Sequence, residues 1–119
     1  MARYFAGITA LDMGDKSEAE ADLTKAAGAS DRNLAALAKI ALANLYAQTG
    51  RSAQAIEEFR SVIAHPTTTV PKSSAQLQLS ALYESTQPEE ARRIYAEIKD
   101  QDKDSDAAQI ASQKLQGNK

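Results

Sequence analysis

Three triplets of apolar residues recur in this sequence at an interval of 36 residues. This interval limits the folds that the chain can adopt. Each triplet has an alanine, a large apolar residue four positions later, and a third apolar residue three positions after that. The triplets are Ala19, Leu23 and Ala26, then Ala55, Phe59 and Val62, then Ala91, Tyr95 and Ile98. Spacings of three and four place side chains on one face of a helix. The chain is therefore predicted to be all-α and to contain three similar helical pieces.

The segment 37–66 predicts the form of each piece. Its apolar residues recur at helical spacing on both sides of Gly50, and a glycine just past a helix end lets the chain turn. The second half is predicted to start at a Ser52 cap and to carry Glu57 and Glu58 on its exposed face. Two such helices cannot cover their own apolar faces, so we expect each hairpin to pack on the next.

Applied to the whole chain, the same pattern predicts one domain. Its expected bounds are residues 1–119, with repeats at about 2–29, 31–65 and 71–100 and a capping helix at about 105–116. Two prolines in the segment 65–71 predict an exposed linker there. Helical periodicity begins almost directly after Met1, so we expect the chain to be a fragment of a longer protein.

Several helix ends are also marked in the sequence. Ser17 and Glu20 have the spacing of a capping box, in which each side chain binds a free backbone N–H of the first turn. Ser30 or Asp31 is expected to cap the first helix of the second repeat. Pro88 is expected at the first position of its helix, where its missing N–H is no loss.

Corresponding residues of the three hairpins resemble the signature of the tetratricopeptide repeat. The matching residues are Ala6, Gly7, Ala10, Gly14, Ala19 and Leu23; Leu42, Ala43, Tyr46, Gly50, Ala55 and Phe59; and Leu79, Ser80, Tyr83, Ala91 and Tyr95. The family's Trp is replaced by Arg3, Lys39 and Gln76, the third turn lacks its Gly, and the family's repeat is nearer to about 34 residues. The resemblance implies an α-solenoid of three repeats and a C-terminal capping helix. A bundle of alanine-rich helices is the alternative, although it would not require one fixed interval.

In tetratricopeptide repeat proteins, the first helices of the repeats line a groove that binds a peptide or a partner protein. The resemblance implies that role here, as a non-enzymatic interaction scaffold. The corresponding groove residues are Tyr4, Ile8, Asp12, Asn44, Gln48, Gln78, Ala81 and Glu84. The Lys and Asn side chains with which the family's chaperone-binding members hold a carboxylate are replaced, so we expect a groove of mixed apolar and amide character.

The alanine-rich helices, the less regular first repeat and the closing segment 106–115, DAAQIASQKL, are similar to the tetratricopeptide-like domain of the YfgM-like group of bacterial ancillary SecYEG translocon subunits. That likeness implies a bacterial protein of the periplasm or cell envelope, near secretion or assembly machinery, with a cytoplasmic location as the alternative. A second function stays open, which is self-association. Pairing of two copies through Tyr4, Phe5 and Ile8 would cover the apolar flank of the first helix.

Composition argues against several other classes of function. The net charge is −2 and no basic stripe with interleaved aromatic residues occurs, so we expect no nucleic-acid partner. The longest apolar run is only a few residues, so we expect no direct membrane contact from this segment. Without cysteine, and with His65 as the single histidine, we expect no catalytic residues, metal ligands or cofactor. The alternating acids from Asp100 to Asp106 lack the Gly and the closing Glu of a calcium loop.

Overall fold

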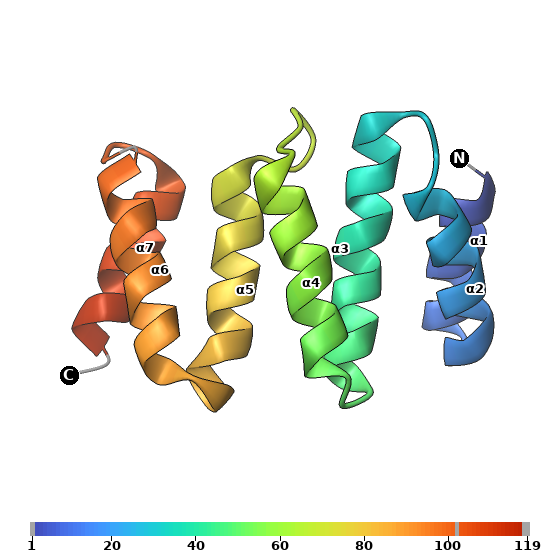
Figure 1. Ribbon diagram of the computed structural model, residues 1–119, viewed down its shortest axis with the longest axis horizontal. Helices are drawn as coiled ribbons and strands as arrows, with labels where there is room; N and C mark the ends of the chain where they lie inside the picture. The colour runs from blue at the N-terminus through green and yellow to red at the C-terminus, as the bar shows by residue number, and fades with distance from the viewer. Residues whose placement is uncertain (1, 102, 118–119) are drawn as a thin grey trace. The chain divides into compact units, whose positions relative to one another are not determined.

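The computed structural model describes residues 2–101 and 103–117, without the side chain of Asp12. Over these ranges the regular structure is entirely α-helical, which confirms the predicted class. The helices are α1 (Ala2–Asp12), α2 (Lys16–Ala27), α3 (Arg32–Gln48), α4 (Ser52–Ala64), α5 (Lys72–Thr86), α6 (Pro88–Gln101) and α7 (Asp106–Gly117) (Figure 1). None of these helices combines the length and the apolar composition that a membrane crossing requires.

The chain divides into two compact units, Met1–Pro71 and Lys72–Lys119. In the first unit α1 packs on α2, α2 on α3 and α3 on α4, and α1 also contacts α3. In the second unit α5 packs on α6 and α6 on α7, and α5 also contacts α7. Hairpins α1–α2, α3–α4 and α5–α6 therefore form as the sequence predicts, while the single domain of three stacked repeats stays a prediction.

The recurring triplets form the centre of each hairpin. Their residues lie on the second helix of each pair and are at most 3% exposed: Ala19, Leu23, Ala26, Ala55, Phe59, Val62, Ala91, Tyr95 and Ile98. Full burial of a side chain the size of leucine or phenylalanine contributes about 1.5–3 kcal/mol. The 36-residue interval thus returns the same packing position to α2, α4 and α6.

Small residues on the first helices let the paired backbones come close. A Cβ atom added at Gly7 would lie 2.7 Å from Cγ of Leu23, which is closer than real Cβ atoms come. Ala43 and Ser80 occupy the corresponding positions on α3 and α5, and both are 0% exposed. The close approach explains why these positions carry small side chains, since a larger one would overlap the facing helix.

The turns inside the hairpins differ in length. Gly14 and Gly50 have φ values of 80° and 78°, a conformation that other residues adopt at a cost, and they turn the first two hairpins. In the third hairpin Gln87 alone separates α5 from α6, and α6 begins at Pro88 as expected.

Two of the predicted caps are wrong. The N-cap of α2 is Asp15, whose carboxylate accepts a hydrogen bond of 3.1 Å from the backbone N–H of Glu18. The helix therefore starts ahead of Ser17, and Ser17 and Glu20 do not form a capping box. A carboxylate is an effective cap because it also meets the positive end of the helix dipole.

The start of α4 also differs from the prediction, whereas the start of α3 agrees with it. Ser52 is the first residue of α4, and no side chain caps this helix, because its N-cap position is held by Arg51. Asp31 caps α3 as expected, accepting hydrogen bonds from the backbone N–H groups of Asn33 and Leu34 at 3.0 and 3.2 Å.

Candidate functional site

The predicted groove residues of the first unit lie on two helices that contact one another. Tyr4 and Ile8 are half-buried on α1, and Asn44 and Gln48 are exposed on α3. The side chain of Asp12 lies outside the part of the chain that the structure describes. The structure therefore places these four side chains on two helices in contact, and a common binding face stays a prediction.

In the second unit the predicted groove residues lie on α5, where Gln78 is half-buried and Ala81 is exposed. Glu84 is held inside the unit, since one of its carboxylate oxygens accepts a hydrogen bond of 2.8 Å from the hydroxyl of Tyr95. The same carboxylate lies 3.5 Å from Nζ of Lys114 on α7. Burial raises the pKa of Tyr95 above its ordinary value, and the hydrogen bond and charge of Glu84 raise it further. Glu84 thus joins three helices.

A pocket of about 390 Å³ lies within the first unit, and it contains none of the predicted groove residues. It is formed by the C-terminal end of α2, the first half of α3, the C-terminal end of α4 and the segment that follows α4. Its lining residues are Ala27, Gly28, Ala29, Arg32, Ala35, Ala36, Lys39, Ser61, Val62, His65, Pro66 and Thr67. Aliphatic side chains make up much of this wall, and Arg32, Lys39 and His65 supply nitrogen donors.

One cation of the pocket is held in place across two helices. Nζ of Lys39 on α3 donates a hydrogen bond of 3.0 Å to the hydroxyl oxygen of Ser61 on α4. Glu58, one turn before Ser61, is half-buried rather than exposed as predicted. Burial raises the pKa of Glu58, the positive charge of Lys39 opposes that rise, and the negative charge of Glu57 adds to it.

The segment after α4 is exposed over most of its length, as predicted, and it is also hydrogen-bonded to the first unit. Val70 is 4% exposed, and its backbone N–H donates to the hydroxyl of Thr67 at 3.0 Å. The backbone N–H of Thr69 donates to the side-chain oxygen of Asn33 on α3 at 3.2 Å. Thr67 lines the pocket, so these bonds hold one wall of it against α3.

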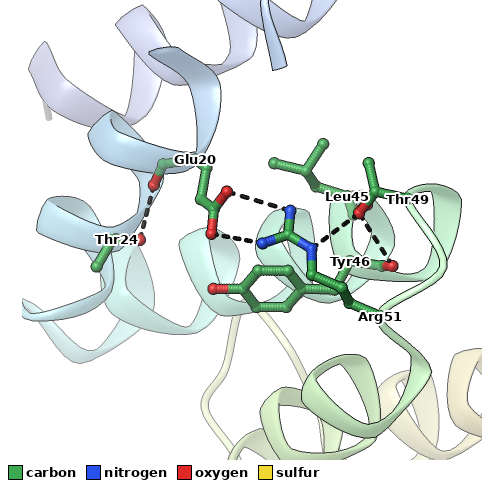
Figure 2. A network of polar contacts seen from close by, with 6 residues as sticks. All are labelled: Glu20, Thr24, Leu45, Tyr46, Thr49 and Arg51. Atoms are coloured by element: carbon green, nitrogen blue, oxygen red, sulfur yellow. Dashed lines mark hydrogen bonds and ion pairs between the residues drawn. The ribbon is translucent and has the colours of Figure 1, made fainter. Parts of the chain in front are cut away.

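A network of polar contacts joins the opposite ends of the same helices (Figure 2). The guanidinium of Arg51 forms an ion pair of 2.9 Å with the carboxylate of Glu20 on α2. It also lies 4.7 Å from the ring centre of Tyr46 on α3. Its Nε donates to the hydroxyl of Thr49, which itself donates to the carbonyl oxygen of Leu45. Burial raises the pKa of Tyr46, and the charge of Glu20 raises it further. The network fixes α2, α3 and α4 at the end away from the pocket.

The first helix of each hairpin carries a polar residue at the same position of the repeat, and these three residues have different partners. Arg3 forms an ion pair of 3.0 Å with Asp22, a residue that is only 6% exposed. Lys39 binds Ser61, as described above. Gln76 is 4% exposed, and its side-chain oxygen has no hydrogen-bond partner among the described residues.

The pocket was not predicted from the sequence. Lys39 was identified there only as a departure from the repeat signature and His65 only as the single histidine, and Arg32 was not identified. The available signal was the cluster of small residues from Ala26 to Ala29, which leaves space beside the end of α2.

A comparison of the chain with protein-family models, curated proteins and solved structures finds no match in any of the three.

Proposed function

We propose that this chain is a non-enzymatic scaffold that binds a peptide or a partner protein. The observation that carries the proposal is the equal burial of the recurring triplets in three consecutive helical hairpins. Hairpins that bury the same positions of their second helices keep corresponding faces of α1, α3 and α5 available for a ligand. Arrays of such hairpins generally act through extended binding surfaces.

The finer proposal is that the hairpins are tetratricopeptide-type repeats of an α-solenoid, closed by α7 as the capping helix. It is supported by the small buried residues at Gly7, Ala43 and Ser80, which match the small position of the repeat signature. The resemblance to the YfgM-like group extends the proposal to an envelope protein that assists secretion or assembly. A protein or peptide is the proposed partner.

The side chains on the proposed binding face suit an extended peptide. Asn44 and Gln48 carry both amide donors and acceptors, which pair with backbone N–H and C=O groups. Tyr4 and Ile8 on the adjoining helix add apolar contact area, and aromatic residues are common at the centre of interfaces. In the second unit, Gln78 and Ala81 provide the corresponding contacts on α5.

Affinity capture from the source cell tests this proposal. The test variant combines Asn44→Ala, Gln48→Ala and Gln78→Ala. The matched control combines Gln54→Ala, Glu57→Ala and Gln113→Ala, which change exposed side chains on α4 and α7. We expect a partner that is retained by the wild type and the control and is lost from the test variant. Equal retention by all three proteins would exclude the first-helix face.

Self-association is a second candidate, and one observation favours it. Phe5 on α1 is 58% exposed, and its ring stands edge-on to that of Tyr4 with 5.6 Å between ring centres. Pairing of two copies would remove this aromatic area from water. Sedimentation velocity over a wide concentration range should then show a dimer for the wild type and a monomer for Phe5→Ser. A wild-type mass that does not change with concentration would reject this candidate.

A further inference from the structure

We propose that the pocket formed by α2, α3 and α4 binds an aliphatic carboxylate, that is, a short apolar chain that ends in a carboxyl group. The pocket shares no residue with the face assigned above to protein binding. The inference therefore stands apart from the proposed function and can fail without affecting it.

The wall of the pocket fits the apolar part of such a ligand. Its volume of about 390 Å³ falls in the range of about 300–1,000 Å³ that is usual for small-molecule sites. Ala35, Ala36 and Val62 contribute methyl groups from α3 and α4, and Ala27 and Ala29 contribute methyl groups from the end of α2. A short aliphatic chain placed against these groups would lose part of its contact with water.

The charged part of the ligand is selected by the nitrogen donors of the pocket. No acidic side chain is among the lining residues. Within the described residues, no hydrogen bond or ion pair engages the side chain of Arg32 or of His65. Arginine binds a carboxylate through two parallel hydrogen bonds, and Lys39 is already oriented by its bond to Ser61. An oriented donor loses less side-chain freedom when the ligand arrives.

The charges around the pocket favour a ligand with a single negative charge. Arg32 and Lys39 are cationic, and the carboxyl of Glu58, one turn before Ser61, already interacts with the charge of Lys39. The C-terminal ends of α2 and α4 also border the pocket and carry partial negative charge. Because these groups offset part of the positive charge, a carboxylate fits the pocket better than a phosphate dianion.

An aliphatic carboxylate has two sources, the C-terminal residue of a peptide and a free short-chain fatty acid, and a titration distinguishes them. We would follow the backbone amide signals of the whole chain by NMR while adding N-acetyl-leucine, N-acetyl-leucine amide or hexanoate. We expect N-acetyl-leucine to shift the signals of residues 27–39 and 61–67 in a saturable way. The uncharged amide should bind about tenfold more weakly, since it lacks a charged hydrogen bond.

The outcome of the titration decides the proposal. Tighter binding of N-acetyl-leucine than of hexanoate would identify a peptide end as the ligand, and the reverse order would identify a free acid. Equal binding of N-acetyl-leucine and its amide would overturn the proposal, as would the absence of saturation with both carboxylates.

Variants locate the site. Arg32→Gln and Lys39→Met should each weaken binding of the carboxylate about tenfold, because each removes a charged donor. Lys16→Gln removes an exposed lysine at the other end of α2 and should leave binding unchanged. Arg32 is exposed, so its variant tests the site even if Lys39→Met fails to fold. Wild-type affinity in Arg32→Gln would show that the carboxylate binds elsewhere.

Discussion

Arg51 and Glu20 lie 31 residues apart in the sequence, and two hydrogen bonds of 2.9 and 3.1 Å join the guanidinium of the one to the carboxylate of the other. The pair ties the turn before α4 to α2. Its geometry is more restricted than that of a single-contact ion pair, because the guanidinium also stacks on Tyr46. The pair therefore links the first hairpin to the second.

Removal of this ion pair should destabilise the first unit. Arg51→Met keeps the side-chain stem and removes the charge, and Glu20→Gln keeps the shape of the carboxylate. Each should lower the midpoint of urea unfolding, and the double variant should be little worse than either single one. Both side chains are about one-third exposed, so salt should reduce the effect.

Arg93 provides a control for this experiment. It pairs with Glu90 and Glu97 on its own helix, and its side chain is 59% exposed. Arg93→Met should therefore change the midpoint less than Arg51→Met. If the changes in midpoint caused by Arg51→Met and Glu20→Gln added up in the double variant, the two side chains would not stabilise the unit as a pair.

Overpacking at the hairpin centre should be costly. Ala55 is 0% exposed where α3 and α4 come together, so Ala55→Leu should lower the free energy of unfolding by about 1–3 kcal/mol. Ala53→Leu introduces the same side chain on the exposed face of α4 and should have little effect. Urea melts of the two variants measure the difference. Equal, small effects would mean that Ala55 is not packed against α3.

The unpaired side-chain oxygen of Gln76 should destabilise the second unit. At the corresponding position Arg3 reaches Asp22, but the third hairpin carries Ile94 where the first has Asp22 and the second has Glu58. Gln76→Met keeps a similar volume and removes the buried polar group, so it should raise the free energy of unfolding by about 1 kcal/mol.

Thermal melts check the effect of Gln76→Met against Gln109→Met, which makes the same change at an exposed position on α7. The Gln76 variant should melt at a higher temperature than the wild type, and the Gln109 variant should not. A lower melting temperature for Gln76→Met would show that the amide has a partner in solution.

Glu58 should make stability depend on pH. Its pKa is raised in the folded chain, so ionisation of the carboxyl disfavours folding. The folded state holds this proton more tightly than the unfolded state, and stability from this group is therefore lost as the pH rises through the raised pKa. Glu58→Gln should be more stable than the wild type at neutral pH.

The advantage of Glu58→Gln should shrink as the pH falls, and it should vanish below about 4.3, the ordinary pKa of a glutamate. Urea melts of both proteins between neutral pH and pH about 4.3 measure the difference in their free energies of unfolding. A difference that does not change with pH would show that it arises from packing rather than from ionisation.

Sequence alone predicted the helical class, the three hairpins and the triplets that their second helices bury. Periodicity was sufficient because the alternation of apolar and polar side chains on a helix repeats regularly, so Ala19, Ala55 and Ala91 could be placed without coordinates. Helix starts were less predictable. Asp15 and Ser17 are both good caps, and only the conformation of the preceding turn decides which of them is used.

The pocket and the polar pairs could not be predicted in the same way. The pocket depends on the distance between the ends of α2 and α4, and on Thr69 binding Asn33, which no local pattern records. Lys39 carries no signal of its bond to Ser61, since a lysine on a helix is ordinarily exposed. Such features arise from contacts between side chains far apart in the sequence.

Within each unit, the helices that pack together are immediate or next neighbours along the chain. Each contact therefore closes only a short loop, and short loops cost little chain entropy. Proteins with such a low contact order fold quickly. A nascent hairpin can gain its structure soon after its residues are synthesised, without waiting for the rest of the polypeptide.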